Sequence, residues 1–275
     1  MEMGIRLHDT IQGTLEERLA FVKGQGFACV HLALSKTLPD FAMADAPEKL
    51  KESSFLETVK GPFDRTGLHC AVLGCYLNLT HPDAAEREKT RRIYEAHLAF
   101  AGKMGAWMVG TETPAHPASP FAQDAPESEE AFLFFLDQLR PLVRRAEEEN
   151  VTLAVEPVYS HIVSTPERAE RMLDAIPSDH LKIILDAVNL LGPGNLARRE
   201  QVLREAMTRL GDRVALLHMK DYRLEGDQMP AMACGEGEMD YGALMAFARR
   251  RDLSMTLENT VPENAVRALE KLRNS

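Results

Sequence analysis

The chain has 275 residues, of which 45% are hydrophobic and 27% are charged, and its formal net charge is −10. This length and composition are typical of a soluble globular protein that can bury a substantial core. An acidic chain is poorly suited to neutralising phosphates, so we expect no nucleic-acid partner.

Short apolar segments recur along the chain, and each is typical of a buried strand. In chain order they are GIRLH (4–8), ACVHLAL (28–34), HCAVLGCYL (69–77), AWMVG (106–110), TLAVE (152–156), KIILD (182–186), VALLH (214–218) and SMTLE (254–258).

Helix signals lie between these segments. Thr14 and Glu17 have the spacing of a capping box, and Thr165 is followed by Pro166, as in an N-cap with proline at the first helical position. PENAVRALEKLR (262–273) predicts a closing helix. The sequence therefore alternates strands and helices from end to end.

The strand candidates are almost continuously hydrophobic, which is typical of parallel strands covered by helices. Eight such units predict an α/β fold of the (β/α)8 TIM-barrel class, with residues 1–275 forming a single domain. Two long polar connections, 111–128 and 220–240, follow strands on the face where barrel enzymes have their sites, so we expect both to serve function.

The first ten residues lack a signal-peptide pattern, and no segment reaches the roughly 18 apolar residues of a membrane span. We therefore expect a cytoplasmic protein with no membrane partner. Cys29, Cys70, Cys75 and Cys234 form no CxxC pair, which favours free thiols and no structural zinc site.

Four consecutive strand candidates end in a group that can bind a metal: Glu156, Asp186, His218 and Glu258. Taken singly, such a residue is more often a helix cap or part of an ion pair. In a barrel, however, the carboxyl ends of these strands converge on one mouth. Three carboxylates and one imidazole then suit a divalent ion, with Mn²⁺, Mg²⁺ or Co²⁺ favoured and Zn²⁺ also compatible.

In TLAVE, LDAVN (185–189), HMKDYR (218–223), GEGEMDY (235–241) and LEN (257–259), the chain resembles the xylose isomerase-like family of sugar phosphate isomerases and epimerases. The resemblance implies that Glu156, Asp186, His218 and Glu258 bind one divalent metal ion, and it suggests a homodimer. Many relatives have His where this chain has Asn189. Asparagine suits a sugar hydroxyl better than a second metal, which disfavours an endonuclease.

Two glutamates beside a metal suggest proton transfer next to a carbonyl. The metal would stabilise an ene-diolate, Glu156 and Glu258 would be the catalytic residues, and the reaction would isomerise or epimerise a small sugar or polyol. If a β-hydroxyl leaves instead, the same site is a dehydratase or lyase acting on a keto-sugar or inosose. A non-catalytic sugar receptor is the third alternative, and the paired glutamates disfavour it.

Other polar residues near strand ends are candidates for substrate binding: His8, Glu112, Asn189, Lys220 and Arg223. A structural ion pair with Lys220 is the favoured role for Asp221. His69 and Trp107 lie near the beginnings of their strands, so we expect them to be structural.

Overall fold

The computed structural model describes residues 1–114, 128–226 and 228–275. In this part of the chain, eight parallel strands close into a barrel in the order β1-β10-β7-β6-β5-β4-β3-β2. These strands are β1 (Met3–Arg6), β2 (Cys29–Leu32), β3 (His69–Gly74), β4 (Met108–Glu112), β5 (Thr152–Glu156), β6 (Leu181–Asp186), β7 (Val214–Met219) and β10 (Met255–Leu257). Each lies within or overlaps an apolar segment of the sequence, and the predicted TIM barrel is confirmed.

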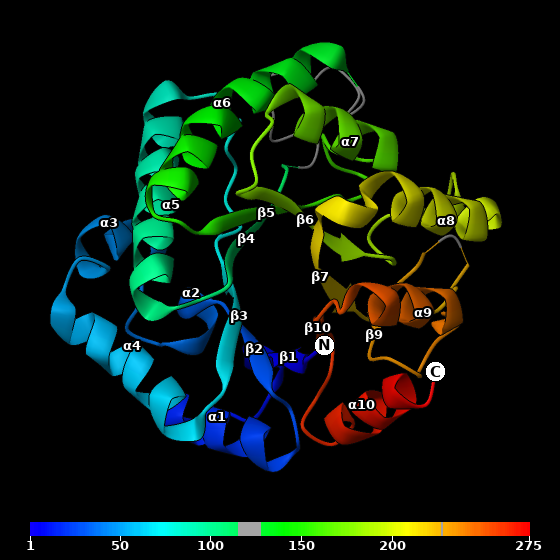
Figure 1. The fold of residues 1–275 in the computed structure, drawn as a ribbon, viewed down its shortest axis with the longest axis horizontal. Coiled ribbons are helices and arrows are strands. Elements are labelled where there is room, and N and C mark those ends of the chain that lie inside the picture. Colours follow the sequence, from blue (N-terminus) through cyan, green and yellow to red (C-terminus); the bar gives the residue numbers. More distant parts are fainter. Residues whose placement is uncertain (115–127, 227) are drawn as a thin grey trace.

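Helices surround the barrel in a ring, which Figure 1 shows in a view down the strands. They are α1 (Leu15–Gly24), α2 (Leu34–Thr37), α3 (Ala46–Lys49), α4 (Ser53–Thr66), α5 (Ala84–Met104), α6 (Glu129–Glu148), α7 (Pro166–Ala175), α8 (Arg199–Leu210), α9 (Gly242–Arg251) and α10 (Ala265–Arg273). Short 3-10 turns accompany them, namely η1 (Leu7–Asp9), η2 (Met43–Asp45), η3 (Leu196–Arg198) and η4 (Gly211–Arg213).

The predicted helix starts at Thr14 and Thr165 are confirmed. Thr14 and Glu17 make both bonds of a capping box, and the Thr165 hydroxyl accepts a hydrogen bond from the backbone N–H of Arg168 at 3.2 Å. The closing helix starts later than its sequence pattern suggests, at Ala265, after a turn in which the Asn264 side chain accepts a hydrogen bond from the backbone N–H of Val261.

The strands are hydrophobic on both faces because both faces are covered. A large cluster packs the barrel against the helices, and a smaller one includes Val72, Ile184 and Leu216. A methyl group placed on Gly110 of β4 would lie 2.6 Å from Val72 of β3 and 3.0 Å from Ile184 of β6. Because β4 and β6 are not neighbours, the smaller cluster lies inside the barrel.

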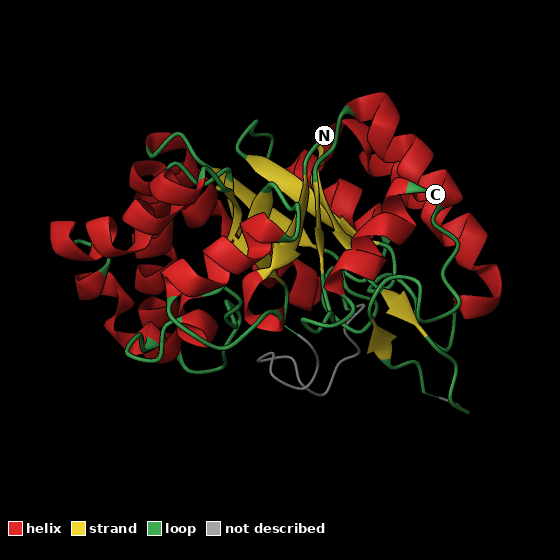
Figure 2. Ribbon diagram, turned by 90° about the horizontal axis from the view of Figure 1, so that it is seen from below, coloured by secondary structure: helices red, strands yellow, loops and turns green. Residues whose placement is uncertain are grey.

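The connection 220–240 carries a short antiparallel hairpin, β8 (Asp221–Tyr222) and β9 (Ala231–Met232), that the sequence did not indicate. Figure 2 shows this hairpin on the side of the barrel away from the two chain ends. Most of the other predicted functional connection, 111–128, lies outside the described residues.

Asp221 organises the connection that contains this hairpin. Its carboxylate accepts hydrogen bonds from the backbone N–H groups of Tyr222, Gly235 and Met239 and from the Tyr241 hydroxyl. The predicted ion pair between Asp221 and Lys220 is wrong, because consecutive residues in an extended segment point to opposite sides. Asp221 is nevertheless structural.

The opposite end of the barrel holds the residues predicted to be structural. His69 begins β3, its ring lies 5.6 Å from that of Trp107, and its Nδ1 lies 2.9 Å from Glu2. All four cysteines are buried free thiols. No helix in the described ranges is long and apolar enough to cross a membrane.

Candidate active site

Strand pairing brings the four predicted metal ligands to one end of the barrel. Asp186 is paired in register with His218. β10 pairs with β7 so that Thr256 lies beside His218, and Glu258 follows two residues later, with its Oε1 3.3 Å from His218 Nδ1. Glu156 ends β5, which pairs with β6. The carboxyl ends of four adjacent strands therefore present all four side chains to one space, as predicted.

His218 is the centre of this group. Its Nδ1 lies 2.9 Å from Glu156 Oε2 and 3.3 Å from Glu258 Oε1, and its side chain has no exposed surface. Ligand atoms of Glu156, Asp186 and His218 all lie within 4.8 Å of one another. A second set with the same spacing is His31, His218 and Glu258, so His218 belongs to both. Each set is compact enough to share one ion.

Asp186 is held by contacts on both of its oxygens. Oδ1 accepts hydrogen bonds from the backbone N–H groups of Val188 and Asn189, at 2.8 and 2.9 Å. Oδ2 lies 2.9 Å from Lys220 Nζ, which is also 3.3 Å from Glu258 Oε2. Lys220 thus supplies a buried positive charge between two carboxylates.

The pKa values reflect this dense packing of charge. Burial alone would lower the pKa of His218, but the charges of Glu258 and Glu156 raise it to about 9. Burial would raise the pKa of Glu258, yet His218, a hydrogen bond from His31 and the charge of Lys220 hold it well below its ordinary value. Burial raises the pKa of Asp186, and Lys220 opposes that shift.

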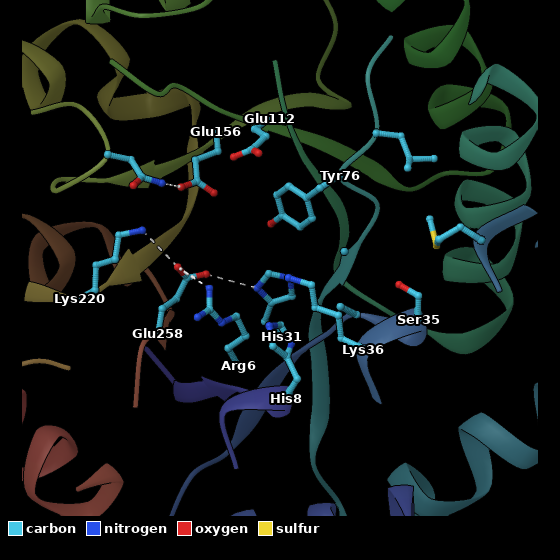
Figure 3. Close-up of a pocket in the computed structure, with 15 residues that line it drawn as sticks. Arg6, His8, His31, Ser35, Lys36, Tyr76, Glu112, Glu156, Lys220 and Glu258 are labelled. Carbon is cyan, nitrogen blue, oxygen red and sulfur yellow. Dashed lines mark hydrogen bonds and ion pairs between the residues drawn. The ribbon is translucent and has the colours of Figure 1, made fainter. Parts of the chain in front are cut away.

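A cavity of about 470 Å³ opens over this group, a volume that suits a small molecule. Figure 3 shows the residues that line it. Four predicted substrate contacts are among them: His8, Glu112, Asn189 and Lys220.

His8 faces the cavity from the turn η1, and Glu112 faces it from the end of β4. Burial, together with the charges of Arg6 and Lys36, lowers the pKa of His8 to about 3. Burial and the nearby charge of Glu156, its partner in strand register, raise the pKa of Glu112 to about 7. His8 is therefore neutral at physiological pH, and Glu112 titrates there.

Asn189 contacts a catalytic candidate directly, since its amide donates a hydrogen bond to Glu156 Oε1. Arg223, in contrast, is exposed, and its guanidinium donates to the backbone carbonyl of Glu236 at 2.7 Å. The β8–β9 hairpin carries Arg223 to the outer surface, so the structure does not bring it to the cavity.

Among the cavity-lining residues that the sequence analysis missed are Arg6, His31 and Tyr76. Arg6 Nη1 lies 3.1 Å from Glu258, and the His31 ring stacks on His218 with centroids 5.1 Å apart. His31 stands inside an apolar strand, where an imidazole is the only sequence signal. Arg6 lies two residues before the end of its strand candidate and could have been noticed there.

The residues present fit a divalent metal ion. Within the described chain, Nε2 of His31 and Nε2 of His218 are buried without a hydrogen-bond partner, and three carboxylates converge beside the two rings. Unpaired buried polar atoms are rare and call for an explanation. Glu156, Asp186, His218 and Glu258 would hold the ion, with oxygen donors in the majority.

Comparison with known proteins gives a family match. The family model described as xylose isomerase-like TIM barrel matches residues 19–275. A search of curated proteins finds no match.

Solved structures share the fold. The 3-keto-D-glucoside 4-epimerase YcjR from E. coli is 19% identical with a TM-score of 0.75, and each chain is covered completely. The zinc-bound IOLI protein is 17% identical with a TM-score of 0.73, over 100% of this chain and 96% of the other. The probable 3-DHS dehydratase AsbF from Bacillus anthracis is 15% identical with a TM-score of 0.73, over 99% and 98%. At these identities the likeness establishes the fold.

Proposed function

The chain belongs to the xylose isomerase-like TIM barrel family, and from this premise we propose that it is a divalent-metal-dependent isomerase or epimerase of a small sugar or polyol. The single observation that carries the proposal is the position of two buried carboxylates, Glu156 and Glu258, on either side of His218 Nδ1. A pair of bases on one substrate site suits the removal and return of a carbon-bound proton.

A bound divalent ion would supply stabilisation for negative charge that develops on substrate oxygens. The surrounding residues supply the rest. Asn189 donates to one oxygen of Glu156 and His218 Nδ1 lies 2.9 Å from the other, so the carboxylate is held in a fixed orientation as a base. Arg6 and Lys220 contact Glu258 and keep it ionised, so it too begins as a base.

Substrate size and chemistry follow from the cavity. Its volume of about 470 Å³ suits a monosaccharide-sized molecule, and its wall mixes hydrogen-bond donors and acceptors, as a polyhydroxylated substrate needs. The oxygen-rich ligand set favours Mn²⁺, Mg²⁺ or Co²⁺ over Zn²⁺.

A dehydratase acting on a keto-sugar or inosose is the second candidate. It is favoured by Lys220, whose ammonium group lines the cavity and could protonate a leaving hydroxyl. A product that has lost water would identify this reaction, whereas a product of unchanged mass would identify isomerisation or epimerisation.

The proposal is tested by metal analysis and by solvent deuterium exchange. D-fructose, D-tagatose, D-psicose and an inosose are incubated with the Mn²⁺-loaded protein in deuterated water. We expect deuterium at a carbon next to a carbonyl of at least one of them, with exchange lost in Glu156→Gln and Glu258→Gln. Glu200→Gln, at an exposed position on α8, is the matched control and should exchange as wild type does. A wild-type protein that binds no divalent metal and exchanges nothing would refute the proposal.

A further inference from the structure

The Tyr76 hydroxyl is buried in the candidate active site without a hydrogen-bond partner among the described residues. The residue follows β3 and lines the cavity, and its ring lies 5.7 Å from that of His31. A buried hydroxyl without a partner destabilises a folded protein, because the group gave up water on folding and received nothing in return. Contacts within the described part of the folded protein therefore do not explain why this position carries a hydroxyl.

Two glycines make room for the tyrosine. Gly74 of β3 and Gly110 of β4 are paired in register. A methyl group on Gly74 would lie 2.9 Å from Tyr76 Cε2, and one on Gly110 would lie 3.2 Å from the Tyr76 hydroxyl. Neither glycine has a positive φ, so close approach, not backbone conformation, accounts for them. The nearest atoms to these methyl groups are His31 Nε2 at 2.7 Å and Val72 Cγ1 at 2.6 Å, so each glycine leaves space for the phenol together with a neighbouring side chain.

The surroundings determine what the hydroxyl can bind. Figure 3 shows it pointing into the space bounded by Glu156, Glu258 and His31. Burial, with the charges of Glu156 and Glu258, raises the pKa of Tyr76 well above its ordinary value, so the phenol keeps its proton. The same negative charges disfavour an anionic group at this position. A neutral oxygen that accepts a hydrogen bond is the matching partner.

We propose that Tyr76 forms a substrate-binding subsite in which its hydroxyl donates a hydrogen bond to an uncharged hydroxyl or carbonyl oxygen of the sugar. The inference rests on the proposed function and assigns the residue that selects for an oxygen at one substrate carbon. In this role the unfavourable burial of the free hydroxyl is relieved when substrate is bound.

The test compares two substitutions that each remove one buried phenolic oxygen. Tyr76→Phe should raise the melting temperature of the free protein by about 2 °C, because the unpaired group is gone. It should also lower kcat/KM for the exchanged sugar at least about tenfold. The Tyr94 hydroxyl contacts the backbone of Leu77 and the Thr111 hydroxyl. Tyr94→Phe should therefore do the opposite, lowering the melting temperature and leaving kcat/KM of the folded protein unchanged.

A second experiment, which varies the substrate, identifies the sugar oxygen that Tyr76 binds. Deoxy analogues of the ketose that wild type exchanges, each lacking one hydroxyl, are assayed with both proteins. For one analogue, the wild-type kcat/KM should fall by about the same factor by which Tyr76→Phe lowers kcat/KM for the parent sugar. With that analogue, Tyr76→Phe should lower kcat/KM no further. If every analogue lowered kcat/KM equally, the proposal that Tyr76 binds one particular oxygen would be overturned.

The failure of the subsite and the failure of the proposed function give different results. If wild type exchanges deuterium and Tyr76→Phe exchanges equally well, the subsite is refuted and the proposed function stands. If wild type exchanges none of the sugars, the proposed function falls and the subsite falls with it.

Discussion

Lys220 Nζ lies 2.9 Å from Asp186 Oδ2 in the protein interior, so a lysine ammonium stands beside a predicted metal ligand. Both side chains are buried, and Lys220 also approaches Glu258. The ammonium neutralises carboxylates that would otherwise repel one another. We therefore expect stability and metal binding to be linked at this contact.

Lys220→Met should destabilise the metal-free protein by about 3–5 kcal/mol, because it leaves the buried carboxylate of Asp186 without its cation. Saturating Mn²⁺ should restore part of this loss, since the ion provides the missing positive charge. Urea unfolding with and without Mn²⁺ measures both effects. Lys23→Met, at an exposed position on α1, is the control and should change stability by less than about 0.5 kcal/mol. Equal Mn²⁺ stabilisation of wild type and Lys220→Met would contradict the linkage.

Metal removal should lower the melting temperature of the wild-type protein. An ion present at about a hundred times its dissociation constant stabilises the folded state by about 2.7 kcal/mol. Asp186→Asn should lose most of this response because it removes a charged ligand. Asp137→Asn, on the exposed side of α6, should keep all of it. Thermal scans with EDTA and with added Mn²⁺ provide the comparison, and an unchanged response in Asp186→Asn would exclude Asp186 as a ligand.

We expect the protein to lose stability in weak acid because of the buried side chain of His97. Its side chain is fully buried on α5, Nδ1 lies 2.8 Å from the Ile93 carbonyl oxygen, and burial lowers its pKa from 6.5 to about 4. Because the folded-state pKa is the lower one, the neutral ring favours folding above pH 6.5 and this contribution disappears as the pH falls toward 4. The shift corresponds to about 3 kcal/mol.

The measurement is the free energy of unfolding between pH 7 and pH 4. His97→Gln, which keeps a donor for the Ile93 carbonyl but does not titrate, should show a flatter profile than wild type. His69→Gln, at an exposed position, should follow the wild-type profile. If the free energy of unfolding falls equally in His97→Gln and in wild type as the pH is lowered, another group causes the loss of stability in acid.

Asp221→Ala should loosen the 220–240 connection, because three backbone N–H groups and the Tyr241 hydroxyl lose one acceptor. The expected cost is about 3 kcal/mol. Faster hydrogen exchange at Gly235 and Met239 would report it, together with a lower kcat/KM if this connection covers the substrate. Asp240→Ala, which removes a single bond to Gly242, should have a much smaller effect. Unchanged exchange in Asp221→Ala would show that other contacts hold the segment.

The fold and the metal-ligand candidates were predictable because their signals are local. A buried parallel strand is a short apolar run, and a charged residue at its end is conspicuous in the sequence. Glu156, Asp186, His218 and Glu258 all follow this pattern, and the barrel brings them together. Their role as ligands stays a prediction until metal binding is measured.

The missed residues depend on distant neighbours. His31 and Tyr76 belong to the site because β2 and β3 face β7 and β10 across the barrel mouth, and no local pattern specifies that approach. The position of Arg223 depends on the β8–β9 hairpin, whose strands have two residues each and are too short to show a period. These features arise from closure of the barrel and from the hydrogen bonds that Asp221 accepts within the 220–240 connection.

The contact between Arg6 and Glu258 crosses the seam where the first and last barrel strands meet. The two residues lie near opposite ends of the chain, so during synthesis on a ribosome Arg6 emerges long before its partner. A nascent chain that has made the first seven strands of the barrel still lacks one catalytic candidate and leaves the edges of β1 and β7 unpaired. Assembly of the site and completion of the barrel are therefore the same event, which delays the site until the last barrel strand has been synthesised.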